Sequence, residues 1–379
     1  MILSNVRILT PNGVKKGNIE IEGNKIKDIN DRQLEGLSFN EDVIVVPGFI
    51  DEHIHGAENC DAMDGTIESL QTIAKALIKE GTTSFLATTM TQSEENISKA
   101  IINIKNYMNN NLAYAEVIGI HLEGPFLNVE ACGAQKPEYI VNPSVEQFKK
   151  YQELSGNSIK LVTIAPEAEN GLKLIKYCKD HGVIASIGHT KANYQQTVDA
   201  MEAGATSVTH CYNAMTGLHH RDVGVVGAAL LHDELNAELI ADGIHVSDAA
   251  IKILHKNKGT DGLVLVTDSL RAKGLSDGIY DLGGQNAVVK NGEARLSNGA
   301  LAGSTLKMNH AVRNVMKFLN VGLEEAVLMA STNPAKKLGV FDRKGSIEIG
   351  KDADLVVLNK DYEVLMTICN GTISYQKGE

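Results

Sequence analysis

A short apolar run, rich in β-branched residues, recurs eight times between residues 44 and 269 and limits the folds that this chain can adopt. Longer stretches such as residues 67–81 and 197–205 lie between the runs, with apolar residues at the three- and four-residue spacing typical of amphipathic helices. Eight strand-then-helix units predict an α/β fold, a (β/α)8 barrel of the TIM type, although a doubly wound sheet produces the same alternation. The runs are residues 44–55, 82–89, 115–124, 159–167, 182–189, 207–214, 237–246 and 263–269.

Both ends of the chain carry a different pattern, short alternating strands broken by turn formers such as PNG at residues 11–13 and NG at residues 370–371. Short hairpins bury little surface alone. We therefore expect the ends to pack together as one small β-sandwich domain, residues 1–46 plus 347–379, beside a barrel domain of residues 47–346. A Gly- and Asn-rich stretch at about residues 270–301 follows the eighth run, and an insertion there would lie at the mouth of an active site.

The composition argues against several classes of function. With 36 basic and 47 acidic residues the net charge is −11, which disfavours a nucleic-acid or anionic-membrane surface. The five cysteines are scattered and never form a C-x-x-C pair, so neither a disulfide framework nor a zinc knuckle is predicted. The start has no leader pattern, and no apolar run reaches the length of about 18 residues that a membrane span needs. We expect a soluble, cytoplasmic protein without nucleic-acid or membrane partners.

Side chains that can bind a metal stand at the C-terminal ends of the predicted strands. Six of the twelve histidines lie there, together with Asp51, Glu123 and Asp268. Because those ends meet on one face of a barrel, we expect these side chains to converge. Imidazole nitrogens and carboxylates suit borderline divalent ions such as Zn²⁺ or Fe²⁺, so the set predicts a metal centre, although a single strand-end histidine is more often structural. The histidines are His53, His55, His121, His189, His210 and His245.

Seven motifs stand in series along the chain. They are PGFIDEHIHG (47–56), HLEGPF (121–126), GHT (188–190), THCYNAM (209–215), ADGIHV (241–246), VTDS (266–269) and LAGS (301–304). Each is weak alone, but in this order they resemble the N-acetylglucosamine-6-phosphate deacetylases of the amidohydrolase superfamily, over about residues 1–375. The resemblance implies a hydrolase of amino-sugar metabolism that converts N-acetyl-D-glucosamine 6-phosphate to D-glucosamine 6-phosphate and acetate.

The resemblance also implies a set of metal ligands. Glu123, His189 and His210 would hold an essential divalent ion and leave a position open for water. Hydantoinase-like members of the superfamily bridge two metals with a carboxylated lysine after the fourth strand, but that strand end reads VTIAPE here. His53 and His55 predict a second ion bridged by Glu123, and the alternative is that they support the first strand by hydrogen bonding. Zinc, iron, manganese or cobalt could fill these sites, one or two per chain.

Asp268 is implied as the general base that takes a proton from the attacking water and then, as general acid, delivers it to the leaving amine. This delivery matters because an amide nitrogen leaves poorly unless it is protonated. By the same resemblance His245 contacts the substrate and orients or polarises the acetyl carbonyl. The alternative role for Asp268 is a carboxylate that is hydrogen-bonded to a ligand histidine.

The substrate phosphate needs a cationic partner, and Arg221, in the segment GLHHRDVG after the sixth run, is the residue that the resemblance places on it. Asn213 and the backbone of Ala214 would lie alongside. The family tends to be dimeric, with residues near this loop reaching the neighbouring subunit's site, which implies a homodimer. Further positions where the family contacts the sugar are Ala134, Gln135, Gly243, Ile244, Leu301, Ala302 and Gly303.

Other chemistries find less support in the sequence. Neither a G-x-x-x-x-G-K-[ST] nor a strand-following G-x-G-x-x-G motif occurs, so we expect no nucleotide cofactor, and a G-x-S-x-G elbow is also missing. Cys211, beside a candidate ligand, is interpreted as a small packed residue. Two alternatives stay open. One is another metal-dependent amidohydrolase, such as an aminoacylase or a dihydroorotase-like hydrolase, which would not need Arg221; the other is a non-catalytic scaffold on the same fold, which would typically have lost ligands.

Overall fold

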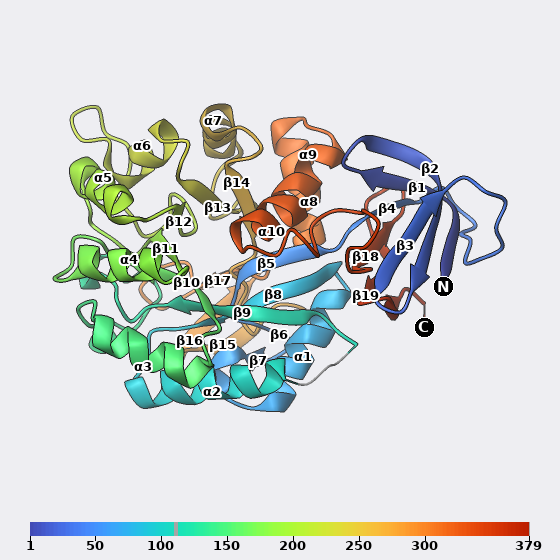
Figure 1. Cartoon of the computed structure of the whole chain (residues 1–379). Coiled ribbons are helices and arrows are strands. Elements are labelled where there is room, and N and C mark those ends of the chain that lie inside the picture. The colour runs from blue at the N-terminus through green and yellow to red at the C-terminus, as the bar shows by residue number, and fades with distance from the viewer. Residues whose placement is uncertain (110–112, 379) are drawn as a thin grey trace.

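Eight parallel strands form the centre of the computed structural model, which describes residues 1–109 and 113–378. Their order is β14-β13-β12-β11-β10-β9-β8-β5, so sequence neighbours pair and the order never reverses (Figure 1). A doubly wound sheet would reverse at its centre, so the predicted (β/α)8 barrel is confirmed. The strands are β5 (Phe49–Ile54), β8 (Thr82–Thr89), β9 (Glu116–Glu123), β10 (Ile159–Ile164), β11 (Ile184–Ile187), β12 (Ser207–Val208), β13 (Asn236–Ile240) and β14 (Leu263–Val266).

A buried side chain closes the barrel between its first and last strands. The Asp51 carboxylate on β5 accepts hydrogen bonds from Thr267, from the backbone amide at 3.2 Å and from the hydroxyl at 2.5 Å. One residue later, the amide of Asp268 donates to the carbonyl of His53 at 2.8 Å. These contacts join the carboxyl ends of β5 and β14, and they fix the backbone of residues 267 and 268 at that end of the barrel.

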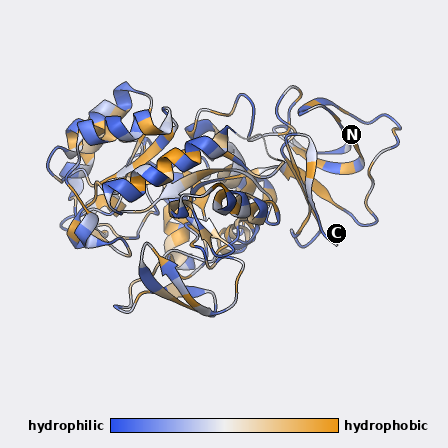
Figure 2. Ribbon diagram, turned by 90° about the horizontal axis from the view of Figure 1, so that it is seen from below, coloured by the Kyte–Doolittle hydropathy of each residue, from blue (hydrophilic) through white to orange (hydrophobic). Residues whose placement is uncertain are grey.

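Helices cover the outside of the barrel and carry both hydrophobic and hydrophilic residues (Figure 2). In α1, for example, Thr66 caps the first turn by accepting from the Ser69 amide, and Leu70, Ile73 and Leu77 are buried along one face. The helices predicted near residues 67–81 and 197–205 correspond to α1 and α5. The helices are α1 (Ile67–Ile78), α2 (Glu94–Met108), α3 (Val145–Ser155), α4 (Gly171–Asp180), α5 (Tyr194–Ala203), α6 (Gly224–Leu231), α7 (Asp248–Lys258), α8 (Met308–Leu319), α9 (Leu323–Val327) and α10 (Asn333–Lys337), with a π-helical turn at Leu328–Thr332 between the last two.

The two ends of the chain join in one seven-stranded sheet of order β20-β19-β18-β4-β1-β2-β3, at one end of the molecule (Figure 1). Residues from both ends, among them Ile8, Ile19, Leu355 and Ile368, share one apolar cluster, so the ends do pack together as the sequence predicts. The predicted domain boundaries themselves stay a prediction. The strands are β1 (Ile2–Thr10), β2 (Gly13–Glu22), β3 (Lys25–Asn30), β4 (Ile44–Pro47), β18 (Leu355–Leu358), β19 (Val364–Cys369) and β20 (Thr372–Gln376).

The stretch after the eighth barrel strand folds as a small antiparallel sheet of β15 (Gly278–Leu282), β16 (Gln285–Lys290) and β17 (Glu293–Arg295). Leu282 and Ala287 of this sheet pack against Met90, which directly follows β8. The remaining elements are the β6 (Gly56–Ala57) and β7 (Cys60–Asp61) pair and 3-10 turns at Ala62–Asp64, Val129–Ala131 and Pro137–Tyr139. None of the helices within the described residues combines the length and apolar character that a membrane span requires.

Candidate active site

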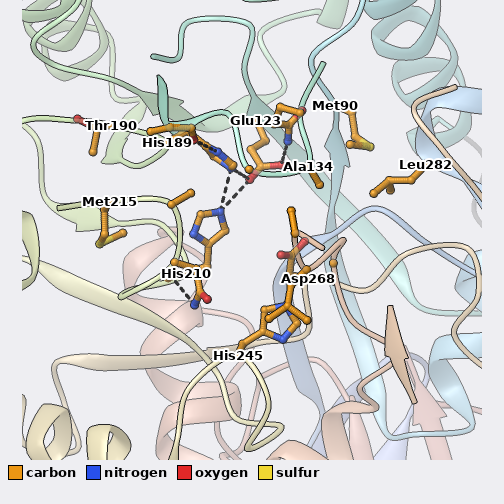
Figure 3. Close-up of a pocket in the computed structure, with 18 of the residues that line it drawn as sticks. Met90, Glu123, Ala134, His189, Thr190, His210, Met215, His245, Asp268 and Leu282 are labelled. Carbon is orange, nitrogen blue, oxygen red and sulfur yellow. Dashed lines mark hydrogen bonds and ion pairs between the residues drawn. The ribbon is translucent and has the colours of Figure 1, made fainter. Parts of the chain in front are cut away.

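A pocket of about 510 Å³ opens at the carboxyl ends of the barrel strands, where the sequence predicts the site (Figure 3). The insertion contributes Leu282 and Arg295 to its wall, which agrees with the expectation that it lies at the mouth. The predicted site residues that line the pocket are His55, Glu123, Ala134, Gln135, His189, His210, Asn213, Ala214, His245, Asp268, Leu301 and Gly303.

Glu123, the last residue of β9, stands at the centre of this arrangement, and Figure 3 shows His189 and His210 pointing toward it. Its Oε1 lies 3.1 Å from the His189 Nε2 and 3.2 Å from the His210 Nε2. Its Oε2 lies 3.1 Å from the His55 Nε2 and accepts a hydrogen bond from Gln135 at 2.7 Å. One carboxylate therefore faces two separate groups of histidines, the placement that a bridging ligand needs.

The second group consists of His53, His55 and Glu123, whose ligand atoms lie within 4.8 Å of one another, as do those of Glu123, His189 and His210. Asp268 Oδ1 adjoins this group, 3.3 Å from the His55 Nε2 and 3.5 Å from the His53 Nε2. The His53 Nε2 is buried without a hydrogen-bond partner among the described residues. An orphaned nitrogen aimed at two carboxylates, in a donor set of imidazoles and carboxylates, fits a divalent cation.

The backbone places three of these residues in a rarely populated conformation. His189, His210 and Asp268 follow their strands with φ angles of 46°, 31° and 46°. Positive φ is uncommon for residues other than glycine and tends to occur at functional sites, where surrounding contacts hold it in place. Here the Asp268 amide and carbonyl are both hydrogen-bonded, to His53 and to the Ser304 amide. The strand ends thus turn sharply enough to aim these side chains into the pocket.

Electrostatics keeps the two central carboxylates ionised. Burial alone would raise the pKa of Asp268, but the charge of His53 and the hydrogen bond from His55 outweigh burial and lower it. Burial likewise opposes the ionisation of Glu123, and the charge of His53 with hydrogen bonds from His189 and His210 holds its pKa well below the ordinary value. Both carboxylates are therefore ionised at neutral pH, which suits ligands of a dication and a proton acceptor.

His245 is aimed into the pocket by a tight turn after β13. Its Nδ1 lies 2.6 Å from Asp242 Oδ2, and the other oxygen of Asp242 accepts the amides of Ile244 and His245 at 2.8 Å each. Burial would lower the pKa of His245, but the hydrogen bond and charge of Asp242 raise it instead. Gly243, with φ of 77°, and Ile244 form this turn and lie outside the pocket wall.

Arg221, Ala302 and His53 are the other predicted residues that do not line the pocket. His53 lies beneath it, fully buried, and Ala302 packs in the apolar cluster of the insertion. Arg221 is exposed, and its guanidinium lies 2.8 Å from the His220 Nε2. Within one chain, therefore, the structure does not bring Arg221 to the residues around Glu123.

Other residues of the site were missed by sequence reasoning. Lys191, Arg295, Glu130 and Met90 line the pocket, yet none belongs to a recognisable motif: Arg295 ends β17, and the other three lie in loops or a 3-10 turn. The position of the insertion after the eighth strand was the one sequence signal for these residues. It indicated that residues 270–301 lie near the pocket but not which of them line it. His121 was counted with the strand-end histidines but turns away, its Nε2 2.8 Å from the Thr163 Oγ1 inside the barrel.

All five cysteines are free thiols in the described structure, as the sequence predicts. Cys211 is fully buried next to His210, and burial raises the pKa of its thiol to about 12. A thiol with such a pKa carries almost no thiolate at neutral pH, so the interpretation of Cys211 as a packed residue agrees with its environment.

Comparison with known proteins gives concordant matches. The profile of the Amidohydrolase family matches residues 44–374. An N-acetylglucosamine-6-phosphate deacetylase of Bacillus subtilis (strain 168) is 46% identical over 99% of this chain and 97% of the relative. An N-acetylgalactosamine-6-phosphate deacetylase of Escherichia coli O157:H7 is 37% identical over 87% and 88%. Among solved structures, a mutant N-acetyl-D-glucosamine-6-phosphate deacetylase of Mycobacterium smegmatis, in complex with N-acetyl-D-glucosamine-6-phosphate, superposes with a TM-score of 0.94 at 30% identity and covers 99% of both chains.

Proposed function

The chain belongs to the amidohydrolase family, within it to the N-acetylglucosamine-6-phosphate deacetylases, and we propose that it hydrolyses N-acetyl-D-glucosamine 6-phosphate to D-glucosamine 6-phosphate and acetate. The observation that carries this function is the convergence of Glu123, His189 and His210 with Asp268 at one pocket, in a chain 46% identical to a deacetylase of that name. The proposed role is a step in amino-sugar breakdown or recycling in the cytoplasm.

The metal centre is proposed to hold one or two divalent ions. Glu123, His189 and His210 would hold the first, and His53 and His55 would share Glu123 with a second. When bound, such an ion lowers the pKa of a coordinated water from about 15.7 to about 7 and so supplies hydroxide at neutral pH. Zinc, iron, manganese and cobalt all suit these nitrogen and oxygen donors, and availability selects among them.

Asp268 moves the proton in this scheme. As an ionised carboxylate it accepts a proton from the attacking water while the oxygen of that water bonds to the acetyl carbon. It then donates the same proton to the amide nitrogen as the carbon–nitrogen bond breaks, so that the amine leaves neutral. The second proton of the water stays on the acetic acid, which releases it to solvent at neutral pH and becomes acetate. His245, held by Asp242, presents its free ring edge to the pocket and orients the acetyl group or the sugar.

Phosphate recognition is proposed to require a second copy of the chain. Arg221 is exposed and lies outside its own chain's pocket, so it would bind phosphate from the neighbouring protomer of a homodimer. Asn213 and Ala214 line the pocket from the same loop region and would meet the phosphate in cis. Arg221 forms bidentate hydrogen bonds with phosphate oxygens in this arrangement, a geometry that lysine cannot supply.

The test is acetate release by purified protein from N-acetylglucosamine 6-phosphate, its unphosphorylated analogue, N-acetylgalactosamine 6-phosphate and an N-acetyl amino acid, with metals counted per chain. We expect the phosphorylated glucosamine derivative to give the highest kcat/KM. Equal rates with and without phosphate would contradict the substrate assignment, and preference for the amino acid would favour an aminoacylase-like hydrolase. If the protein binds metal yet releases no acetate, it is a non-catalytic scaffold. The presence of the metal ligands and of Asp268 argues against that alternative.

A further inference from the structure

A buried carboxylate beneath the pocket contacts two of the proposed ligand residues at once. Glu238 lies in the middle of β13 and is fully buried. Its Oε2 lies 2.9 Å from the His53 Nδ1 and accepts a hydrogen bond from the His210 amide at 3.1 Å. Its own carbonyl accepts from the Cys211 amide at 2.9 Å. Glu238, on the seventh barrel strand, therefore contacts the side chain of His53 on the first strand and the backbone of the residues that follow the sixth strand.

This contact determines which nitrogen of His53 faces the pocket. A carboxylate can only accept, so the Nδ1 of His53 carries a proton, and when the ring is neutral, as a metal ligand must be, the lone pair lies on Nε2. That Nε2 lies 3.4 Å from Glu123 and 3.5 Å from Asp268, without a hydrogen-bond partner in the described part of the chain. The tautomer that Glu238 selects is thus the one that leaves Nε2 free to bind a metal.

A lysine with a buried side chain lies near Glu238. The Lys337 Nζ, from α10, lies 3.8 Å from Glu238 Oε1, bonds to the fully buried Glu52 and donates to the Ser207 hydroxyl at 2.7 Å. A buried carboxylate stays ionised only beside such a compensating charge. Glu52 shares the lysine, but among the described residues it makes neither of the hydrogen bonds to His53 and His210 that Glu238 makes, and this difference makes it a matched control.

We propose that Glu238 is a positioning residue for the metal centre, which orients His53 as a ligand of the second ion and steadies the backbone of His210 at the first. The inference rests on the proposed function only in taking His53 as a ligand. Outer-shell carboxylates of this kind change metal affinity by about 10- to 100-fold when they are removed. Because His53 loses its anionic partner, the effect falls mainly on the second ion.

The test compares Glu238→Gln with Glu52→Gln in the full-length protein. Metals per chain are counted after dialysis against zinc, and the affinity of each ion is measured by competition with a chelator; thermal unfolding monitors the fold. We expect Glu238→Gln to bind the second ion at least tenfold more weakly, because the glutamine offers no negative charge to the His53 ring. It should retain the first ion, because its oxygen can still accept from the His210 amide. Glu52→Gln is expected to keep both affinities near those of the unchanged protein.

Four results would overturn the proposal. They are unchanged affinities in Glu238→Gln, an equal loss in Glu52→Gln, a single ion in the unchanged protein, or a third ion, which would make His53, His121 and Glu238 a separate metal site. If Glu238→Gln does not fold, Glu238→Asp replaces it, since it keeps the charge near Lys337 but withdraws the carboxylate from His53. A wrong substrate assignment would give a different result, because the unchanged protein would then bind both ions normally and release no acetate.

Discussion

Replacement of Asp268 by asparagine isolates its proton transfer from its structural contacts. The backbone at this position has φ of 46°, a conformation that asparagine adopts more readily than most residues. The hydrogen bonds from the Asp268 amide to His53 and from the Ser304 amide to the Asp268 carbonyl, both 2.8 Å, involve main-chain atoms and survive the change. What is lost is the carboxylate, whose Oδ1 lies 3.3 Å from the His55 Nε2.

We expect kcat of Asp268→Asn to fall by about 10²- to 10⁴-fold, the usual contribution of a general acid–base residue, or about 3 to 5.5 kcal/mol of barrier. Acetate release measures kcat, elemental analysis the metals per chain, and thermal unfolding the fold. The control is Asp361→Asn, which removes an exposed carboxylate and should change none of the three. A kcat within tenfold of the unchanged enzyme would refute the assignment, and loss of bound metal in parallel with activity would make Asp268 a ligand instead.

Three further outcomes are expected. Replacing both His53 and His55 by asparagine should lower the metal count from two towards one per chain while the circular-dichroism spectrum stays unchanged; a count that stays at two would exclude them as ligands. Arg221→Ala should raise KM for the phosphorylated sugar by about 10- to 100-fold, which corresponds to the binding free energy of a charge-assisted hydrogen-bond pair. It should leave turnover of the unphosphorylated analogue unchanged. Partial desolvation of the His310 ring, although the residue is exposed, and the charge of Arg313 lower the pKa of His310 to about 4. Because the unfolded chain has a pKa near 6.5 and binds the proton first, the contribution of His310 to the unfolding free energy should fall as pH drops from about 6.5 to about 4 and stay level above that range. In urea titrations His310→Asn should reduce this slope, and an identical slope would contradict the shift.

The positions of the site residues could be predicted because a parallel barrel gathers all its strand ends on one face. Glu123, His189 and His210 stand at the ends of three different strands, and knowing the strands was enough to bring them together. The pairing of His53 with His55 followed from the two-residue period of a strand in the same way. These inferences needed only the order of elements and no knowledge of loop conformation.

The ends of the strands themselves were less predictable, because the site distorts them. The run at residues 207–214 reads as a strand, yet β12 ends at Val208, since His210, Tyr212 and Ala214 all have positive φ. Nor does any local pattern show that Arg221 lies away from its own pocket, because the path of that loop depends on long-range contacts. Glu238 was missed for a different reason: a single acidic residue in an apolar strand has no periodicity, and only the fold reveals its partners.

The closure of the barrel and the placement of the proposed base use the same few hydrogen bonds. Asp51 accepts hydrogen bonds from the amide and the hydroxyl of Thr267, and the next amide, that of Asp268, donates to the carbonyl of His53. These backbone contacts between the first and last strands thus fix Asp268 relative to His53 of β5 and to His55 just after it, independently of the contacts of its carboxylate. Because positive φ at Asp268 is unfavourable in isolation, these contacts must supply the energy that maintains it. The proposed base is therefore positioned by the fold's own closure, and its carboxylate stays free to exchange a proton.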